Sequence, residues 1–131
     1  MNNPGSTAAP YGGLCWRESS SGKLSLFAII RNNAAPYLNG IALYKFNTAT
    51  SYSGAAYSPL FTEAVWTNDL YWVKMQDNAT DRIFSISVDG ENWHVHHTVG
   101  RTDFLTADEW GIFANSNNSD VGVQLVSWSE T

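Results

Sequence analysis

The sequence predicts an all-β protein, a two-sheet antiparallel β-sandwich, on three observations. Short segments in which apolar and polar residues alternate recur along the chain, separated by clusters of Gly, Asn and Ser. Aromatic residues make up 14% of the 131 residues, whereas strong helix formers such as Lys and Glu are few. The pair Asp89-Gly90 lies between two such segments and is typical of a turn that joins two strands.

Alternation and turn residues place eight strands, with bounds good to about two to four residues. They cover residues 13–18, 24–31, 40–46, 70–76, 82–88, 92–98, 110–115 and 121–129. The turn Asp77–Asp81 is expected to close a hairpin between the fourth and fifth of them. One short helical turn is expected at 105–110, with Thr106 as its N-cap ahead of Asp108 and Glu109.

The two-residue period of a strand assigns side chains to faces. The apolar sides are those of Phe84, Ile86 and Val88, of Leu24, Leu26 and Ala28, and of Val121, Val123 and Leu125. Ser85 and Ser87 lie on the opposite side of the first of these strands, which we therefore expect to be half-buried. Two sheets packed face to face would bury the three apolar sides together.

The longest irregular segment runs from Asn47 to Asn68 and carries several aromatic residues among Ser, Thr, Ala and Gly. A loop of this length inside a compact domain is usually functional or mobile. The alternative is a further strand inside the segment, for which Ala64–Trp66 is the candidate.

Size and charge limit the classes of protein and partner. The chain has the usual length of one domain, so residues 1–131 are expected to form a single β-sandwich domain. A net charge of −5 repels phosphate backbones and anionic lipid, so we expect no nucleic-acid partner. No apolar run is long enough for a signal peptide or a membrane span, so no membrane insertion is expected. The single cysteine, Cys15, is expected to be a buried small hydrophobe rather than a reactive thiol.

Several segments carry a resemblance to a known family. They are Gly13-Leu-Cys-Trp-Arg-Glu-Ser-Ser-Ser-Gly-Lys23, Tyr71-Trp-Val-Lys74, Ser85-Ile-Ser-Val-Asp-Gly-Glu-Asn-Trp93, Gly111-Ile-Phe-Ala-Asn115 and the final apolar strand. In this order they resemble the concanavalin A-like lectin/glucanase jelly roll over nearly the whole chain. A family first strand normally precedes the Gly13 region, so the resemblance implies a fragment of a longer protein that lacks its first strand.

The resemblance implies a fold more strongly than an activity. Similar modules are accessory carbohydrate-binding domains beside glycosidases, cell-surface adhesion domains, and parts of phage tails or virion decorations. The segment Ser87-Val-Asp-Gly-Glu-Asn-Trp93 is also similar to the sialidase Asp box, with a spacing one residue short. That box is structural in its own family, so Asp89 is expected to be a turn residue and Trp93 a core or rim packing residue.

Catalytic motifs give little support for an enzyme. Glycosidases of the glucanase branch carry Glu-x-Asp-x-Glu along one strand, and no such run exists here. The only carboxylates two residues apart, Asp89 and Glu91, straddle a turn. A pair of carboxylates from different strands that meet in a cleft remains the alternative for glycoside hydrolysis.

Two segments are candidates for metal binding. His94 and His96 are expected on one face of their strand and His97 on the other, so a transition metal would need a third ligand from elsewhere. The alternative is a polar strand that faces solvent. The loop 115–120 offers oxygen ligands for calcium from Asn115, Asn117 and Asp120, and its alternative is a plain turn.

The sequence feature that points most directly to a ligand is the supply of aromatic residues in expected loops beside Asn, Ser and Asp. These aromatic residues are Tyr37, Tyr52, Tyr57, Trp66 and Trp110, with Asn115 and Asn117 as polar partners. Sugars present apolar C–H faces and many hydroxyls, which suit aromatic platforms with a few amide partners. The same aromatic residues would equally fill a core or a subunit interface.

These observations predict a non-catalytic carbohydrate-binding, lectin-like or adhesion module that is extracellular or virion-associated, with a glycan or a protein surface as its partner. The alternative is a structural or assembly domain of a phage virion or surface protein, which would form oligomers or need its parent protein. Glycoside hydrolysis is the third hypothesis. No cofactor is required by the sequence, and calcium is the metal to test.

Overall fold

The computed structural model describes residues 11–31, 39–57, 72–116 and 129, and these residues form strands and connections without a helix. The strands are β1 (Tyr11–Arg17), β2 (Leu24–Arg31), β3 (Asn39–Thr48), β4 (Ser51–Tyr57), β5 (Trp72–Asp77), β6 (Asp81–Ser87), β7 (His94–Gly100) and β8 (Glu109–Asn115). Within the described residues, no helix is long and apolar enough to span a membrane.

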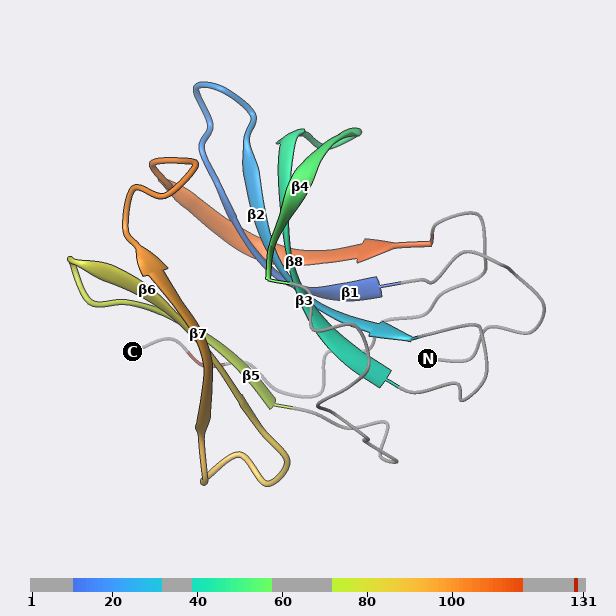
Figure 1. Ribbon diagram of the computed structural model, residues 1–131, viewed down its shortest axis with the longest axis vertical. Helices are drawn as coiled ribbons and strands as arrows, with labels where there is room; N and C mark the ends of the chain where they lie inside the picture. Colours follow the sequence, from blue (N-terminus) through green and yellow to red (C-terminus); the bar gives the residue numbers. More distant parts are fainter. Residues whose placement is uncertain (1–10, 32–38, 58–71, 117–128, 130–131) are drawn as a thin grey trace.

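The strands form two antiparallel sheets. One has five strands in the order β4-β3-β2-β1-β8, and the other has three in the order β5-β6-β7. Figure 1 shows them as two separate twisted sheets, joined on the described chain by the connection from β7 to β8. This all-β, two-sheet arrangement is consistent with the predicted β-sandwich.

Seven of the predicted strands are confirmed to within about two residues, and β2 has the predicted bounds. The predicted hairpin at Asp77–Asp81 joins β5 to β6. Of the eighth predicted strand, residues 121–128 lie outside the described part of the chain. The segment Asn47–Asn68 does contain a missed strand, β4, whereas Ala64–Trp66 lies outside the described residues.

The predicted helical turn at 105–110 is wrong, because β8 begins at Glu109 and the residues before it are irregular. The amide of Thr106 and the carboxylate of Asp108, which would lie in the first turn of a helix, are instead hydrogen-bonded to the connection between β1 and β2. The amide of Thr106 donates to Glu18 Oε1 at 2.9 Å, and Asp108 Oδ1 accepts from the amide of Ser19 at 2.7 Å. These long-range bonds replace the local capping that the sequence suggested.

Aromatic side chains from both sheets meet in the core between them. Its buried members are Trp16, Phe27, Ile41, Leu43, Phe84, Ile86 and Leu105. Phe84 is fully buried, and its ring centroid lies 5.4 Å from those of both Trp16 and Phe27 in edge-to-face geometry. Such contacts add about 0.5–1.5 kcal/mol each to the burial of the rings. Phe84 therefore connects β6 to two strands of the larger sheet.

The prediction that the Leu26 and Ala28 side of β2 faces the other sheet is wrong. Residues directly opposite in an antiparallel pair share a face, and Phe27 stands opposite Leu14 and Leu43. Since Phe27 contacts Phe84, its side of β2 faces the three-stranded sheet. Leu26 and Ala28 are buried on the opposite face, which we call the outer face.

The physical reason is that β2 is a central strand with apolar residues on both sides. A strand buried on both faces has a nearly continuous apolar run rather than an alternating one. The run from Leu26 to Ile30 is of this kind. The alternation of Leu24 and Leu26 with Ser25 therefore identified one buried side of β2, but it did not reveal that the side of Phe27 is buried as well.

On β6, the prediction of a half-buried strand is wrong in two respects. Phe84 and Ile86 lie in the core as predicted, but Ser85 and Ser87 are buried as well, at 2% and 4% exposure. Val88 is 62% exposed, because β6 ends at Ser87 and the alternation of a strand no longer applies. Ser85 and Ser87 carry small side chains and stand opposite the larger Lys74 and Trp72 of β5, so little of their surface faces solvent.

Gly13 of β1 marks a close approach between neighbouring strands. A Cβ atom added at this position would lie 2.1 Å from the carbonyl oxygen of Phe27. No side chain fits at that distance, so pairing of β1 with β2 requires glycine here.

Candidate functional site

The outer face of the five-stranded sheet carries a series of aromatic rings that are in mutual contact. We call them the aromatic row: Tyr11 of β1, Tyr44 and Phe46 of β3, Tyr52 of β4 and Phe113 of β8. The ring centroids of Tyr11 and Tyr44 are 5.3 Å apart, and those of Tyr11 and Phe113 are 6.0 Å apart. The row thus extends from one edge strand of the sheet towards the other.

The strand register explains how rings from β1 and β3 meet across β2. Gly13, Ala28 and Ala42 stand opposite one another on the outer face of β1, β2 and β3. These residues carry no side chain larger than a methyl group. Tyr11 lies two residues before Gly13 on β1, and Tyr44 lies two residues after Ala42 on β3. Their rings can therefore approach each other above these small residues of β2 and its neighbours.

Tyr52 forms the exposed end of the aromatic row. Its ring lies edge-on to Tyr44 at 5.8 Å and to Phe46 at 5.4 Å, with interplanar angles of 76° and 74°. The residue is nevertheless 57% exposed. Tyr52 is therefore a ring that two neighbours hold in place while much of its surface faces solvent.

Hydrogen-bonding groups accompany the rings. The side-chain amide of Asn115 donates from Nδ2 to the hydroxyl oxygen of Tyr11 at 2.8 Å. Burial raises the pKa of Tyr11 and that of Tyr44 above the ordinary tyrosine value. Both phenols therefore keep their protons at neutral pH and stay hydrogen-bond donors.

Two of the predicted ligand residues, Tyr52 and Asn115, are connected by the aromatic row and lie at its opposite ends. Tyr52 lies at the β4 end, and Asn115 bonds to Tyr11 at the β8 end. Trp110 does not join them, because it stands opposite Trp16 and so projects from the inner face. The other predicted residues lie outside the described side chains; they are Tyr37, Tyr57, Trp66, Asn117 and, for the metal, Asp120.

Most of the aromatic row was not predicted from the sequence, namely Tyr11, Tyr44, Phe46 and Phe113. A signal for part of it was present, because Ala42, Tyr44 and Phe46 recur every second residue along one strand. Tyr52 was expected in a loop, whereas it lies on β4 opposite Phe46. Pairing with β3, rather than a loop conformation, sets the direction of its ring.

The described residues offer limited support for a metal site. They contain no group of three or more His, Cys, Asp or Glu side chains that could hold a metal ion. In the predicted calcium loop, the amide nitrogen of Asn115 is bonded to Tyr11, and both Asn117 and Asp120 lie outside the described residues. Calcium binding by the loop stays a prediction.

The three histidines are arranged differently from a regular strand. A register shift between Phe84 and Ser85 places His97 opposite Phe84 and His94 opposite Ile86, both on the inner face. The expectation that His97 lies on the face opposite to His94 is therefore wrong. His94 and His96 do lie near each other, with ring centroids 6.4 Å apart.

Asp89 is a turn residue, as predicted. Its Oδ1 accepts from the amides of Glu91 and Asn92 at 2.9 Å and 2.8 Å and from the hydroxyl of Ser87 at 2.8 Å. The side-chain amide of Asn92 donates to Oδ2 at 2.7 Å. These bonds, that of the Asn92 side chain foremost, hold the pKa of Asp89 well below its ordinary value. Asp89 is thus unsuited to be the general acid of a glycosidase at neutral pH.

Trp93 and Cys15 are packing residues. Trp93 is half-buried, and Lys74 Nζ lies 4.5 Å from the centroid of its ring. Cys15 is partly buried against the outer-face cluster, and burial raises the pKa of its thiol. Cys15 thus packs against apolar residues as predicted, but it is partly buried rather than buried. A thiol of raised pKa is a poor nucleophile.

Comparison of the chain with protein-family models, with curated proteins and with solved structures found no match in any of the three. The resemblance to the concanavalin A-like superfamily therefore stays a prediction.

Proposed function

We propose that this protein is a non-catalytic carbohydrate-binding or adhesion module, a jelly-roll sandwich of the concanavalin A-like type, that binds a glycan at the exposed Tyr52 end of the aromatic row. The observation that carries the proposal is the exposed ring of Tyr52, held between Tyr44 and Phe46. Location on a cell surface or a virion, with a glycan on the facing surface as partner, belongs to the same proposal.

Rigid aromatic rings suit a sugar for two reasons. The C–H face of a pyranose is apolar and nearly flat, so it loses little by leaving water when it stacks on a ring. A ring that its neighbours already hold loses little conformational entropy on binding. Tyr52 meets both conditions, because its exposed surface is large and its orientation is fixed by two contacts.

The polar groups of the row favour a neutral ligand. The rings and Asn115 carry no formal charge, and the phenol of Tyr44 stays protonated at neutral pH. Hydroxyl-rich, uncharged saccharides match phenol and amide groups better than phosphates or sulfates do. The net charge of −5 likewise disfavours anionic ligands.

The test is binding of purified protein, of measured oligomeric state, to a broad glycan and polysaccharide panel with calcium and with chelator. Binding in both conditions is the expected result, because the aromatic row needs no metal. Binding that vanishes with chelator would move the site to the loop 115–120. No binding at millimolar sensitivity would contradict the proposal.

A second candidate function, subunit assembly, is favoured by a different surface. Trp110 and Ile112 of β8 are 51% and 46% exposed and lie on the same side of the sheet as Trp16 and Leu14. Neighbouring exposed apolar residues on a strand are typical of protein contacts. Assembly predicts a mass that rises with concentration and falls to that of a monomer in Trp110→Ala. A constant monomer mass would remove this candidate.

A further inference from the structure

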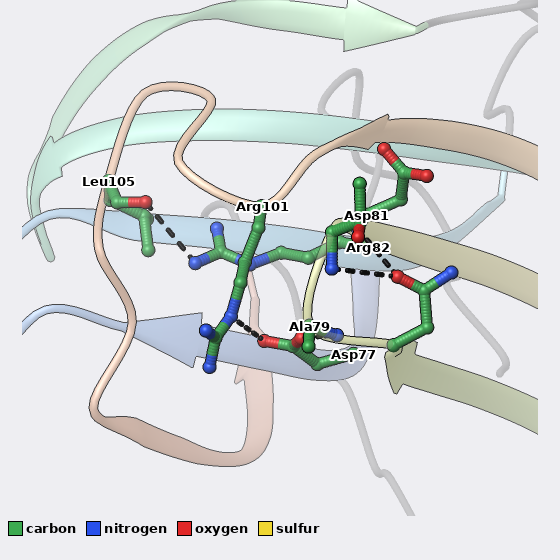
Figure 2. A network of polar contacts seen from close by, with 8 residues as sticks. Asp77, Ala79, Asp81, Arg82, Arg101 and Leu105 are labelled. Carbon is green, nitrogen blue, oxygen red and sulfur yellow. Dashed lines mark hydrogen bonds and ion pairs between the residues drawn. The ribbon is translucent and has the colours of Figure 1, made fainter.

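Arg82 of β6 places a positive charge inside the sandwich. The residue is 2% exposed and projects from the same side of β6 as Phe84. Its guanidinium carbon lies 5.0 Å from the centroid of the Trp16 ring, and Nη2 donates to the carbonyl oxygen of Leu105 at 3.2 Å. Figure 2 shows this side chain directed at Leu105, whereas the neighbouring Arg101 is directed at Asp77.

Two nitrogen atoms of Arg82 lack an acceptor in the part of the chain that the structure describes. Nε and Nη1 are both buried, and neither has a hydrogen-bond partner among these residues. An unpaired buried donor destabilises the folded state, and more so when it is charged. A buried lysine or carboxyl avoids this cost by becoming neutral, but a guanidinium stays protonated in proteins. Nε and Nη1 of Arg82 therefore need an acceptor that the described residues do not supply.

The carboxylates that act on Arg82 through charge are bonded to other groups. Burial lowers the pKa of Arg82, and the charges of Asp77, Asp103 and Glu18 act in the opposite direction. Asp77 Oδ2 pairs with Nε of Arg101 at 2.8 Å, and Asp103 Oδ2 pairs with Nζ of Lys45 at 2.7 Å. Glu18 accepts from the amide of Thr106 at 2.9 Å. The charge of Arg82 is thus offset only in part and at a distance, while Nε and Nη1 stay unbonded within the described residues.

We infer that one of these unpartnered donors of Arg82, Nε or Nη1, binds a small monovalent anion, chloride or another halide, between the two sheets. A halide is compact, accepts hydrogen bonds from any direction and leaves water more readily than phosphate or a carboxylate does. The three nearby carboxylates disfavour a second negative charge, so a divalent anion does not fit. The bound halide would connect β6 to the segment at Leu105 that leads into β8.

The first test is thermal unfolding in sodium chloride and sodium bromide against sodium gluconate at equal ionic strength. A ligand that binds the folded state alone raises Tm with the logarithm of its concentration above Kd. We expect this halide-specific rise in the wild type and its loss in Arg82→Met, which removes the guanidinium and keeps a long, unbranched side chain. Arg101→Met, which removes an exposed, paired guanidinium, should keep the rise. An equal rise in Arg82→Met, or none in the wild type, would overturn the inference.

A second test uses the wild type alone and so does not depend on the folding of Arg82→Met. Crystals grown or soaked in bromide should show an anomalous peak within hydrogen-bond distance of Nε or Nη1 of Arg82. Peaks confined to the surface would identify an adventitious ion only and would contradict the internal site. A water molecule at both nitrogen atoms would contradict it equally.

Discussion

The ring of Tyr52 stands edge-on to the ring of Tyr44, with centroids 5.8 Å apart and an interplanar angle of 76°. This contact connects an edge strand, β4, to its neighbour β3 on the outer face of the larger sheet. It holds an exposed aromatic ring in one orientation without burying it. The proposed glycan site depends on that combination of exposure and order.

The first prediction concerns the stability of this exposed ring. Tyr52→Ala should lower the free energy of unfolding by about 1 kcal/mol, because two edge-to-face contacts are lost while the residue is largely exposed. Denaturant unfolding measures the change. Val95→Ala, at a residue that is 55% exposed on β7, is the control and should change it by less than about 0.5 kcal/mol. A loss above about 3 kcal/mol for Tyr52→Ala would identify a core residue instead.

The second prediction tests which side of β2 faces the other sheet. Phe27→Leu and Phe84→Leu should show a coupling energy of about 0.5–1.5 kcal/mol in a double-mutant cycle, because the two rings are in contact. Leu26→Ala and Phe84→Leu should be additive within about 0.5 kcal/mol, because Leu26 belongs to the outer face. Coupling in the second cycle and additivity in the first would reverse the assignment.

The third prediction concerns the close approach of β1 and β2. Gly13→Ala should destabilise the protein by roughly 3 kcal/mol, because its Cβ would lie 2.1 Å from the Phe27 carbonyl oxygen and a strand must shift. Gly54→Ala is the matched control, since a Cβ there meets no atom within 4 Å. It should leave stability unchanged or slightly raised. Equal Tm values for the two variants would show that β1 does not pair with β2 at this distance.

The fourth prediction is a pH dependence at Asp89. Its turn bonds, led by that of the Asn92 side chain, place the pKa of the folded state below that of the unfolded state. The ionised carboxylate therefore stabilises the fold above the ordinary carboxyl pKa of about 4, and this contribution is lost as pH falls through the folded pKa. Asp89→Asn should have a lower Tm than the wild type at neutral pH.

The difference in Tm between wild type and Asp89→Asn should shrink as pH falls below about 4. Glu91→Gln, in the same loop, is the control for the loss of one exposed negative charge. A Tm difference that stays constant from neutral to strongly acidic pH would show that the charge of Asp89 contributes nothing to the stability of the fold.

Much of the fold was predictable because alternation and turn residues are local signals. Asp77–Asp81 and Asp89-Gly90 were identified from residue type alone, and both connect paired strands. Strand β4 was missed because Ser51–Tyr57 consists mainly of small residues, which carry a weak strand signal. The second buried side of β2 was missed because an apolar run on both faces has no period.

The candidate site was less predictable than the fold, because it is built from residues on four strands. Tyr52 and Asn115 were singled out from composition, but nothing local in the sequence shows that both contact the same series of rings. Trp110 carried the same compositional signal and lies on the other face. The charge of Arg82 inside the core was equally hidden, because its partners Trp16 and Leu105 are distant in the sequence.

The most direct test of the central claim compares Tyr52→Ala with Trp110→Ala in affinity for the glycan that the wild type binds best, by titration calorimetry. These two exposed aromatic residues project from opposite faces of one sheet, so each controls for the other. We predict that Tyr52→Ala lowers the affinity about tenfold or more, which corresponds to about 1.4 kcal/mol of binding free energy. Trp110→Ala should keep the wild-type affinity. Wild-type affinity in Tyr52→Ala, with or without a loss in Trp110→Ala, would contradict a glycan site at the aromatic row.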